Sequence, residues 1–281
     1  MRLTARIVFF LCLVAMATQA TAQIVEYKDE ERISADSLLR AYDKLPYFSI
    51  YKDNYFTIGT TLGSPPSRHN SDVKFQLSIA QRLTKSTLPW KTYAYLFFTE
   101  KTMWNVFEPS LPMRDLNFNP GLGIGKWLIS KDRVIGKAIL TLEHESNGRD
   151  SIWDRSWNKL SLGVALYIDP HFMVYGKGWL AYIDSKQNKD ILSYSGIYQA
   201  GFQWISSNER WVFDCTFVKR KGWNFNGNWI INAGFRLFKN HNQFLMIHYY
   251  NGYGENLLDY KQYHNRLRIG LLIRPNLFSD F

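Results

Sequence analysis

His144 and Ser146 lie two residues apart in the segment His144-Glu145-Ser146, a spacing that could support nucleophilic catalysis. On a β-strand, residues i and i+2 share one face with Cα atoms roughly 7 Å apart, so their side chains can reach hydrogen-bonding distance. A serine hydroxyl is a poor nucleophile until a base takes its proton, and histidine is the usual base. The pair therefore predicts a serine-hydrolase site on a strand face.

Asn158 could complete a triad with this pair from the next expected strand. A catalytic histidine needs a partner on its other ring nitrogen to fix its tautomer and orientation. An amide oxygen can be that partner, and at a lipid boundary a neutral Asn costs far less to desolvate than an Asp. The alternative is that these are incidental polar residues at strand ends.

Segments of alternating apolar and polar residues, each about ten to fourteen residues long, follow one another from about Tyr51. Bacterial outer-membrane barrels have an even number of strands that alternate between lipid-facing and lumen-facing residues. The pattern predicts an all-β fold, a 12-stranded antiparallel transmembrane β-barrel. The expected strands are 53–63, 72–83, 91–104, 117–129, 135–146, 157–169, 172–184, 193–206, 210–220, 227–238, 243–253 and 264–275.

The last of these segments shows the alternation well, because Leu267, Ile269 and Leu271 oppose Arg266 and Arg268. A soluble barrel would turn its apolar face inward, whereas here the charged face suits a lumen. No run of 18 apolar residues follows the N-terminal segment, which excludes a helical membrane protein. A soluble β-sandwich remains an alternative on alternation alone.

The parity of the strands places the candidate site on the lipid side. His144 and Ser146 share a face with Leu140 and Leu142, and Asn158 begins a similar apolar series on its own strand. With a periplasmic N-terminus, odd-numbered strands run outward, so the site would lie near the outer leaflet. Polar groups that face lipid indicate function, and a nucleophile there would meet the acyl esters of lipids.

The chain ends agree with an exported barrel. Residues 1–22 read as a signal peptide, with Arg2 and Arg6 ahead of an apolar stretch and Ala20-Thr21-Ala22 before the expected cleavage point. Residues 23–50 form an expected periplasmic N-terminal arm, in which Ser34 could cap a short amphipathic helix. Residues 51–281 form the expected barrel with its lipid-facing active site. A C-terminal Phe281 is typical of chains assembled into the outer membrane.

Charge and cysteine content narrow the remaining classes. The chain carries a net charge of +10, reduced to about +8 without the two arginines of the signal peptide. No Lys/Arg cluster or RNA-binding motif is present, so nucleic acid is not an expected partner. Cys215 remains alone once Cys12 is removed, so no internal disulfide is expected and Cys215 is read as an apolar filler.

Several motifs resemble the outer membrane phospholipase A family. His144-Glu145-Ser146-Asn147-Gly148-Arg149 with Arg155-Ser156-Trp157-Asn158 is similar to its active-site signature. Val73-Lys74-Phe75-Gln76-Leu77-Ser78 looks like its second strand. Ser110-Leu111-Pro112-Met113-Arg114-Asp115 with Asn117 and Pro120, and Gly252-Tyr253-Gly254-Glu255-Asn256-Leu257-Leu258-Asp259-Tyr260, resemble later segments. Together the motifs span most of the mature chain in the family's order.

The resemblance implies roles for individual residues. Ser146 would be the nucleophile, His144 the general base and acid, and Asn158 the residue that orients the histidine. It also implies Ca²⁺ as cofactor, activation as a homodimer, and a metal site formed by the Arg149 carbonyl, the Asp154 side chain and Ser110 of a second copy. Asp154 stands where the family commonly has Ser, which favours tighter calcium binding. Gln187 stands where the family has an acid before a segment like Asn188-Lys189-Asp190-Ile191, with Asp184 three residues earlier, so this chain departs from the family at its further calcium site.

These features predict an outer-membrane esterase that hydrolyses acyl esters of glycerophospholipids and lysophospholipids, a phospholipase A1/A2. Two alternatives stay open at this point. One is a porin or structural barrel in which His144 and Ser146 are incidental. The other is a family member that has lost control by calcium or dimerisation.

Overall fold

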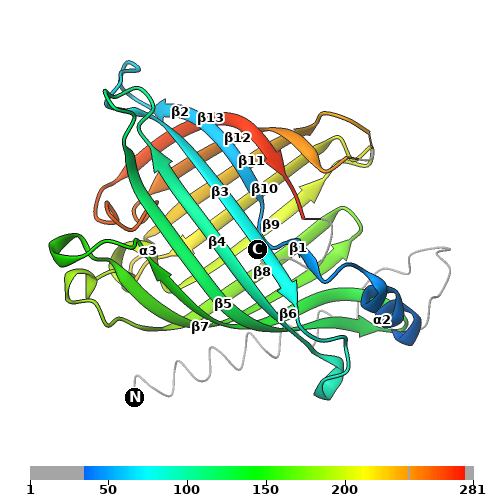
Figure 1. Cartoon of the computed structure of the whole chain (residues 1–281). Helices are drawn as coiled ribbons and strands as arrows, with labels where there is room; N and C mark the ends of the chain where they lie inside the picture. The colour runs from blue at the N-terminus through cyan, green and yellow to red at the C-terminus, as the bar shows by residue number, and fades with distance from the viewer. Residues whose placement is uncertain (1–34, 240, 276–281) are drawn as a thin grey trace.

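A closed antiparallel β-barrel makes up most of the computed structural model, which describes residues 35–239 and 241–275 (Figure 1). Its strands are β2 (Asn54–Thr61), β3 (Ser71–Arg82), β4 (Tyr93–Trp104), β5 (Met113–Ser130), β6 (Arg133–Ser146), β7 (Ser156–Asp169), β8 (Phe172–Tyr182), β9 (Tyr198–Ile205), β10 (Trp211–Lys219), β11 (Gly227–Arg236), β12 (Gln243–Gly252) and β13 (His264–Ile273). Strands consecutive in sequence pair with each other, and β13 pairs with β2 to close the wall. The predicted 12-stranded antiparallel barrel is confirmed.

Several strand boundaries differ from the sequence prediction, and β5, for example, starts at Met113 and not at residue 117. A short strand, β1 (Phe48–Ile50), pairs with β3 ahead of β2, and the register shifts between Ile50 and Tyr55. The wall therefore begins at Phe48 and contains a bulge before β2. β9 starts at Tyr198 and not at residue 193, because the first residues of the expected strand belong to the short helix α3 (Leu192–Ser195).

The two ends of the barrel have connections of different length. At what we call the turn end, most strands are joined by short segments such as 131–132, where Lys131 and Asp132 have φ of 47° and 60° and suit a tight hairpin turn. The exception is the connection 83–92 between β3 and β4. At the loop end the connections are longer, at 62–70, 105–112, 147–155, 183–197, 220–226 and 253–263. Short periplasmic turns and long extracellular loops are typical of bacterial barrels. The loop end therefore has the longer connections that are typical of the extracellular side.

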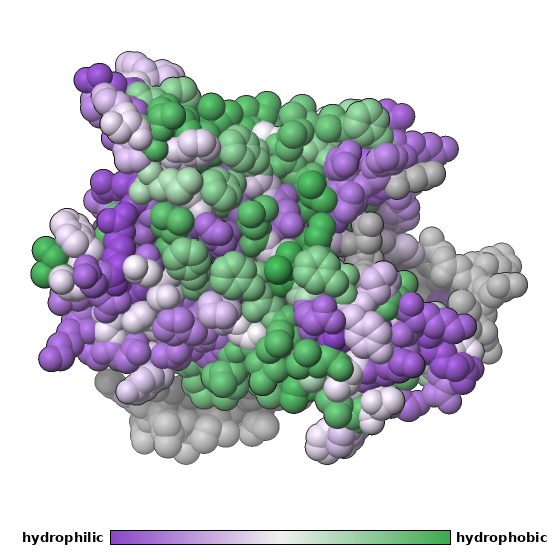
Figure 2. All heavy atoms as spheres, in the orientation of Figure 1, coloured by the Kyte–Doolittle hydropathy of each residue, from purple (hydrophilic) through white to green (hydrophobic). Residues whose placement is uncertain are grey.

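The outer wall of the barrel is apolar and its interior is charged. On β6, Leu142 is 59% exposed, whereas the next residue, Glu143, is 3% exposed. On β13, Leu267, Ile269 and Leu271 are exposed while Arg268 is buried. Figure 2 shows that apolar side chains gather across the middle of the visible wall, with polar ones toward the two ends. The predicted apolar-out, charged-in alternation is confirmed, as a lipid-facing wall requires.

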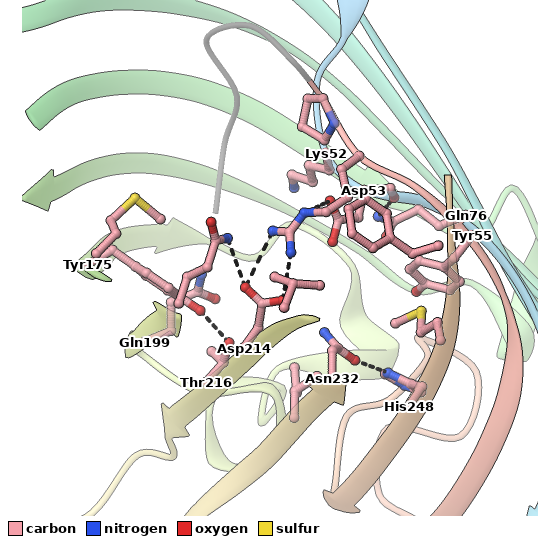
Figure 3. A pocket seen from close by; sticks show the side chains of 18 of the residues that line it. Lys52, Asp53, Tyr55, Gln76, Tyr175, Gln199, Asp214, Thr216, Asn232 and His248 are labelled. Atoms are coloured by element: carbon pink, nitrogen blue, oxygen red, sulfur yellow. Dashed lines mark hydrogen bonds and ion pairs between the residues drawn. The ribbon is translucent and has the colours of Figure 1, made fainter. Parts of the chain in front are cut away.

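Ion pairs fill much of the lumen. Arg268 bonds both Asp72 and Glu255, and Lys74 lies 3.1 Å from Glu255. A cavity of about 680 Å³ remains beside these groups, lined in part by Asp214, whose carboxylate accepts a hydrogen bond from Arg274 (Figure 3). Buried charges persist when each has a partner of opposite charge. The lumen is therefore a charge-paired interior.

Helix α2 (Ala35–Lys44) packs at the turn end, where Tyr42 contacts Tyr93 and Trp127 of the wall (Figure 1). The predicted amphipathic helix of the N-terminal arm is confirmed over these residues, while Ser34, the signal peptide and Phe281 lie outside the described residues. No described helix is both long and apolar enough to cross a bilayer.

Arg82 fastens the C-terminus of α2 to the barrel. Its guanidinium donates to the carbonyls of Tyr42, Asp43 and Leu45 at 2.8, 3.2 and 2.9 Å. It also lies 4.6 Å from the ring centre of Tyr42. Carbonyls at a helix end lack intrahelical donors and attract cations. Arg82 supplies both the donors and the charge that this helix end needs.

We expect Arg82→Ala to lower the free energy that holds α2 on the barrel by about 2–4 kcal/mol, because three charge-assisted hydrogen bonds are lost. Limited proteolysis of the folded barrel should then cut the α2 segment faster. Arg40→Ala is the matched control, since Arg40 contacts only Ser37 of its own helix among the hydrogen bonds of the described residues. Equal cleavage of the two variants would contradict the role of Arg82.

Candidate active site on the outer face of β6 and β7

His144 and Asn158 lie directly opposite each other on β6 and β7. The Asn147 N–H donates to the Arg155 carbonyl in the same register, so odd-numbered residues of β6 bond to β7. The 144/158 pair is therefore a non-hydrogen-bonded pair, in which opposing side chains approach most closely. His144 Nδ1 lies 2.9 Å from Asn158 Oδ1.

This contact sets the tautomer of the imidazole. An amide oxygen only accepts hydrogen bonds, so Nδ1 of His144 carries the proton and donates to Asn158 Oδ1. Nε2 is left as an acceptor. That is the form in which a histidine can take a proton from a hydroxyl. Ser146, two residues along the same strand face, offers such a hydroxyl.

The three side chains lie on the outside of the barrel. Their strands carry exposed leucines at matching parity, including Leu142 and Leu160. The intervening residues face inward, as shown by Trp157 Nε1, which donates to Glu145 Oε2 at 3.0 Å. None of the three lines the large lumen cavity. The geometry agrees with the parity expected from the sequence, and it separates the candidate site from the lumen.

Asn147 organises the loop that follows Ser146, a role that sequence reasoning missed. Its Oδ1 accepts from the Arg155 N–H at 3.0 Å, and its Nδ2 donates to the Trp153 carbonyl at 2.9 Å. The side chain is buried. The available signal in the sequence was an Asn-Gly pair directly after the expected strand, since asparagine side chains commonly bond the backbone of turns. These bonds close the loop 147–155 beside the candidate nucleophile.

The structure brings two of the three predicted metal ligands onto this loop. Arg149 and Asp154 both belong to 147–155, and Arg149 also donates to the Arg114 carbonyl of β5 at 2.6 Å. Ser110 lies on the separate loop 105–112, with φ of 64°. Within the described ranges no three carboxylate, imidazole or thiol side chains gather as a metal cluster. The predicted ligand set instead combines one carboxylate with a carbonyl and a hydroxyl, all hard oxygen donors that suit Ca²⁺.

The loops 183–197 and 253–263 lie at the same end of the barrel as the site and are joined by an ion pair. Burial acts to raise the pKa of Asp190, but hydrogen bonds from Lys261 at 2.7 Å and from Tyr260 outweigh it and lower this pKa. Burial, followed by the hydrogen bond to Asp190, raises the pKa of Tyr260 to about 12. Asp190 is thus engaged in this contact. Asp184, in the same loop, accepts from Ser156 Oγ at 3.2 Å.

The lowered pKa of Asp190 predicts how pH affects these loops. A carboxyl whose pKa falls on folding contributes stability above its unfolded pKa of about 3.9, and this is lost as pH falls through the folded value. We expect the protection of amides in 253–263 against exchange, relative to their intrinsic rates, to fall below about pH 4. Asp190→Asn should abolish that fall, and an unchanged pH dependence of protection in this variant would contradict the assignment.

A family model described as Phospholipase A1 matches residues 23–273 of this chain. Among curated proteins, Phospholipase A1 of Escherichia coli K12 is 28% identical over 211 residues, covering 72% of this chain and 69% of that protein. Phospholipase A1 of Klebsiella pneumoniae is 26% identical and covers 97% of this chain and 99% of that protein. The match includes the whole barrel and the candidate site.

Solved structures agree on the fold. The outer membrane phospholipase A of E. coli aligns with a TM-score of 0.70 at 24% identity, covering 81% of this chain and 98% of that one. The Salmonella typhi outer membrane phospholipase dimer, solved with bound calcium, aligns with a TM-score of 0.69 at 25% identity, covering 80% and 91%. The barrel and these relatives place the protein in the bacterial outer membrane. Because the Phospholipase A1 family model matches residues 23–273 of the 281 residues, the chain belongs to the phospholipase A1 family.

Proposed function

We propose that this protein hydrolyses acyl ester bonds of glycerophospholipids and lysophospholipids. The candidate bonds are the sn-1 ester, as in a phospholipase A1, and the sn-2 ester, as in a phospholipase A2. The observation that carries the proposal is the 2.9 Å contact of His144 Nδ1 with Asn158 Oδ1 on the lipid-facing wall, with Ser146 on the same strand face. A base already held in its proton-accepting tautomer beside a serine is the arrangement that acyl transfer needs. Family membership supports the same reaction class.

In the proposed mechanism, Ser146 Oγ attacks the ester carbonyl while His144 Nε2 takes its proton. Asn158 holds the imidazole in place through Nδ1 and compensates part of its positive charge. His144 then gives the proton to the departing alcohol oxygen, which leaves an acyl group on Ser146. Water, deprotonated by His144, attacks this ester and releases the fatty acid, restoring Ser146.

Calcium is proposed as the cofactor, held by the Arg149 carbonyl, the Asp154 carboxylate and Ser110 of a second copy. The donor set fits a hard divalent cation, and the S. typhi relative was solved with calcium bound. When bound, the ion would stabilise the negative charge that forms on the ester oxygen. The same relative is a dimer, and a homodimer is proposed here because the resemblance to the outer membrane phospholipase A family implies that Ser110 comes from a second copy.

The location of the triad supports membrane phospholipid as the substrate. The side chains around it on β6, β7 and β8 include the exposed apolar residues Leu142, Leu160 and Leu180. An acyl chain in the outer leaflet could reach Ser146 without leaving the apolar layer. Hydrolysis would then act on phospholipid that has reached the outer leaflet.

The test is a hydrolysis assay on detergent-purified protein with mixed micelles of phosphatidylcholine. We expect fatty acid release with calcium present and little release with a chelator. No release under either condition would contradict the proposed function and would favour the structural-barrel alternative. Equal release with and without chelator would contradict the calcium assignment alone.

Asp154 is expected to raise the affinity for calcium, because a carboxylate adds a full negative charge to the ligand set. We predict that Asp154→Ser weakens calcium binding about tenfold or more, measured by isothermal titration calorimetry of the folded protein. Asp150→Ser is the control, since Asp150 precedes the same short turn, η3 (Ser151–Trp153), and is not a proposed ligand. An equal loss of affinity in both variants would indicate general electrostatics and not ligation.

A further inference from the structure

Pro120 lies within β5 directly opposite His144. The register pairs Phe118 with Ser146 and Gly121 with Glu143, which leaves Pro120 facing His144 at an interruption of the ladder. Proline has no N–H to donate, so within sheets it is found at edges and bulges. A closed barrel has no such edge, and β5 is paired on both sides. The position therefore requires a compensating donor.

The alternation of the ladder identifies which group loses its donor. Along an antiparallel strand, successive residues direct their N–H and C=O groups to opposite neighbours. Asn147, directly after β6, donates its N–H to the Arg155 carbonyl at the start of β7. The main-chain N–H and C=O of the even-numbered His144 therefore point the other way, toward β5. The Pro120 nitrogen lies where the donor to the His144 carbonyl would be. The backbone of the proposed catalytic base is thus the group affected.

Asn119 supplies the missing hydrogen bond. Its Nδ2 donates to the His144 carbonyl at 2.8 Å. The Asn119 side chain is buried, on the lumen side of the wall, where it borders a second cavity. A buried carbonyl without a donor is costly, so this contact decides how firmly β6 is held at that residue. We propose that Asn119 is a positioning residue for His144, replacing the main-chain donor that Pro120 lacks.

The inference rests on the proposed function and adds a residue to it that touches neither substrate nor the reacting atoms. With Asn119 truncated, the His144 carbonyl would lose its donor from β5, and β6 would be held less firmly at this residue. Proton transfer requires the imidazole to reach both Ser146 and Asn158, so a small shift of the strand lowers turnover more than substrate binding. The expected signature is a fall in kcat with little change in KM.

The experiment compares Asn119→Ala with the double variant Asn119→Ala/Pro120→Ala, in which residue 120 regains an N–H. On phosphatidylcholine mixed micelles with calcium, we expect kcat to fall about tenfold in Asn119→Ala, with KM within about twofold of the wild type. The double variant should return to within about threefold of the wild type, because its main-chain N–H can donate to the His144 carbonyl. Amide exchange in residues 143–147 should rise and recover in parallel.

Asn242→Ala is the matched control, since Asn242 Nδ2 also donates to a backbone carbonyl, that of Arg274, but at the turn end. It should leave kcat unchanged. A wild type without hydrolysis would contradict the proposed function. An active wild type with unimpaired Asn119→Ala, or a loss that Pro120→Ala fails to recover in folded protein, would overturn the positioning role alone.

Discussion

Ser146→Ala is expected to lower phospholipid hydrolysis by at least about 10³-fold while leaving the barrel folded. The reason is chemical, since the variant lacks the oxygen that forms the acyl-enzyme and no group replaces it. The hydroxyl is not needed for the wall, because the ladder of β6 and β7 at this point is formed by main-chain atoms. The measurement is fatty acid release under saturating calcium, with folding checked by the heat-dependent shift of barrels on gels.

Ser156→Ala is a stringent control for this result. Ser156 is the direct cross-strand partner of Ser146 and shares its face of the sheet, but its hydroxyl donates to Asp184. We expect less than a threefold change in activity, on the order of a single surface hydrogen bond. If the two serine variants lose activity equally, or if neither does, Ser146 is not the nucleophile.

Asn158→Ala carries the second largest expected effect, a fall in kcat on the order of 10²-fold. Without Oδ1 the His144 imidazole loses the partner that fixes its tautomer and ring orientation. In triads with an acid in this role, the wrong tautomer costs about 10⁴-fold, and a neutral amide contributes less charge stabilisation than a carboxylate. The effect should appear in kcat with KM nearly unchanged.

Asn251→Ala provides the comparison for Asn158. Asn251 also lies near the loop end, on β12, and donates to Tyr263 OH at 2.6 Å, far from β6 in the strand order. It should retain wild-type turnover. A similar kcat for Asn158→Ala and Asn251→Ala would show that His144 does not depend on Asn158 for its orientation.

The barrel could be predicted from the sequence because residues in each strand alternate with a period of two. The alternation is strong because one face of the wall carries apolar side chains toward lipid and the other carries charged side chains toward the lumen. The position of His144 and Ser146 on the apolar parity follows from the same period. The period of two fails to identify the short helix α3. Its residues alternate between apolar and polar side chains like the start of a strand, but in the structure they form a helix within the loop before β9.

What the sequence by itself determined is the number of strands, their inward and outward faces and the residue types of the candidate site, since these depend on local periodicity and chemistry. The tertiary structure decided the cross-strand register. Register places Asn158, and no other residue of β7, within hydrogen-bonding distance of His144 Nδ1. It also sets Pro120 opposite His144 and gives Asn119 its role. Register depends on pairing between strands and on loop lengths, and a one-residue slip would move these partners to the other face.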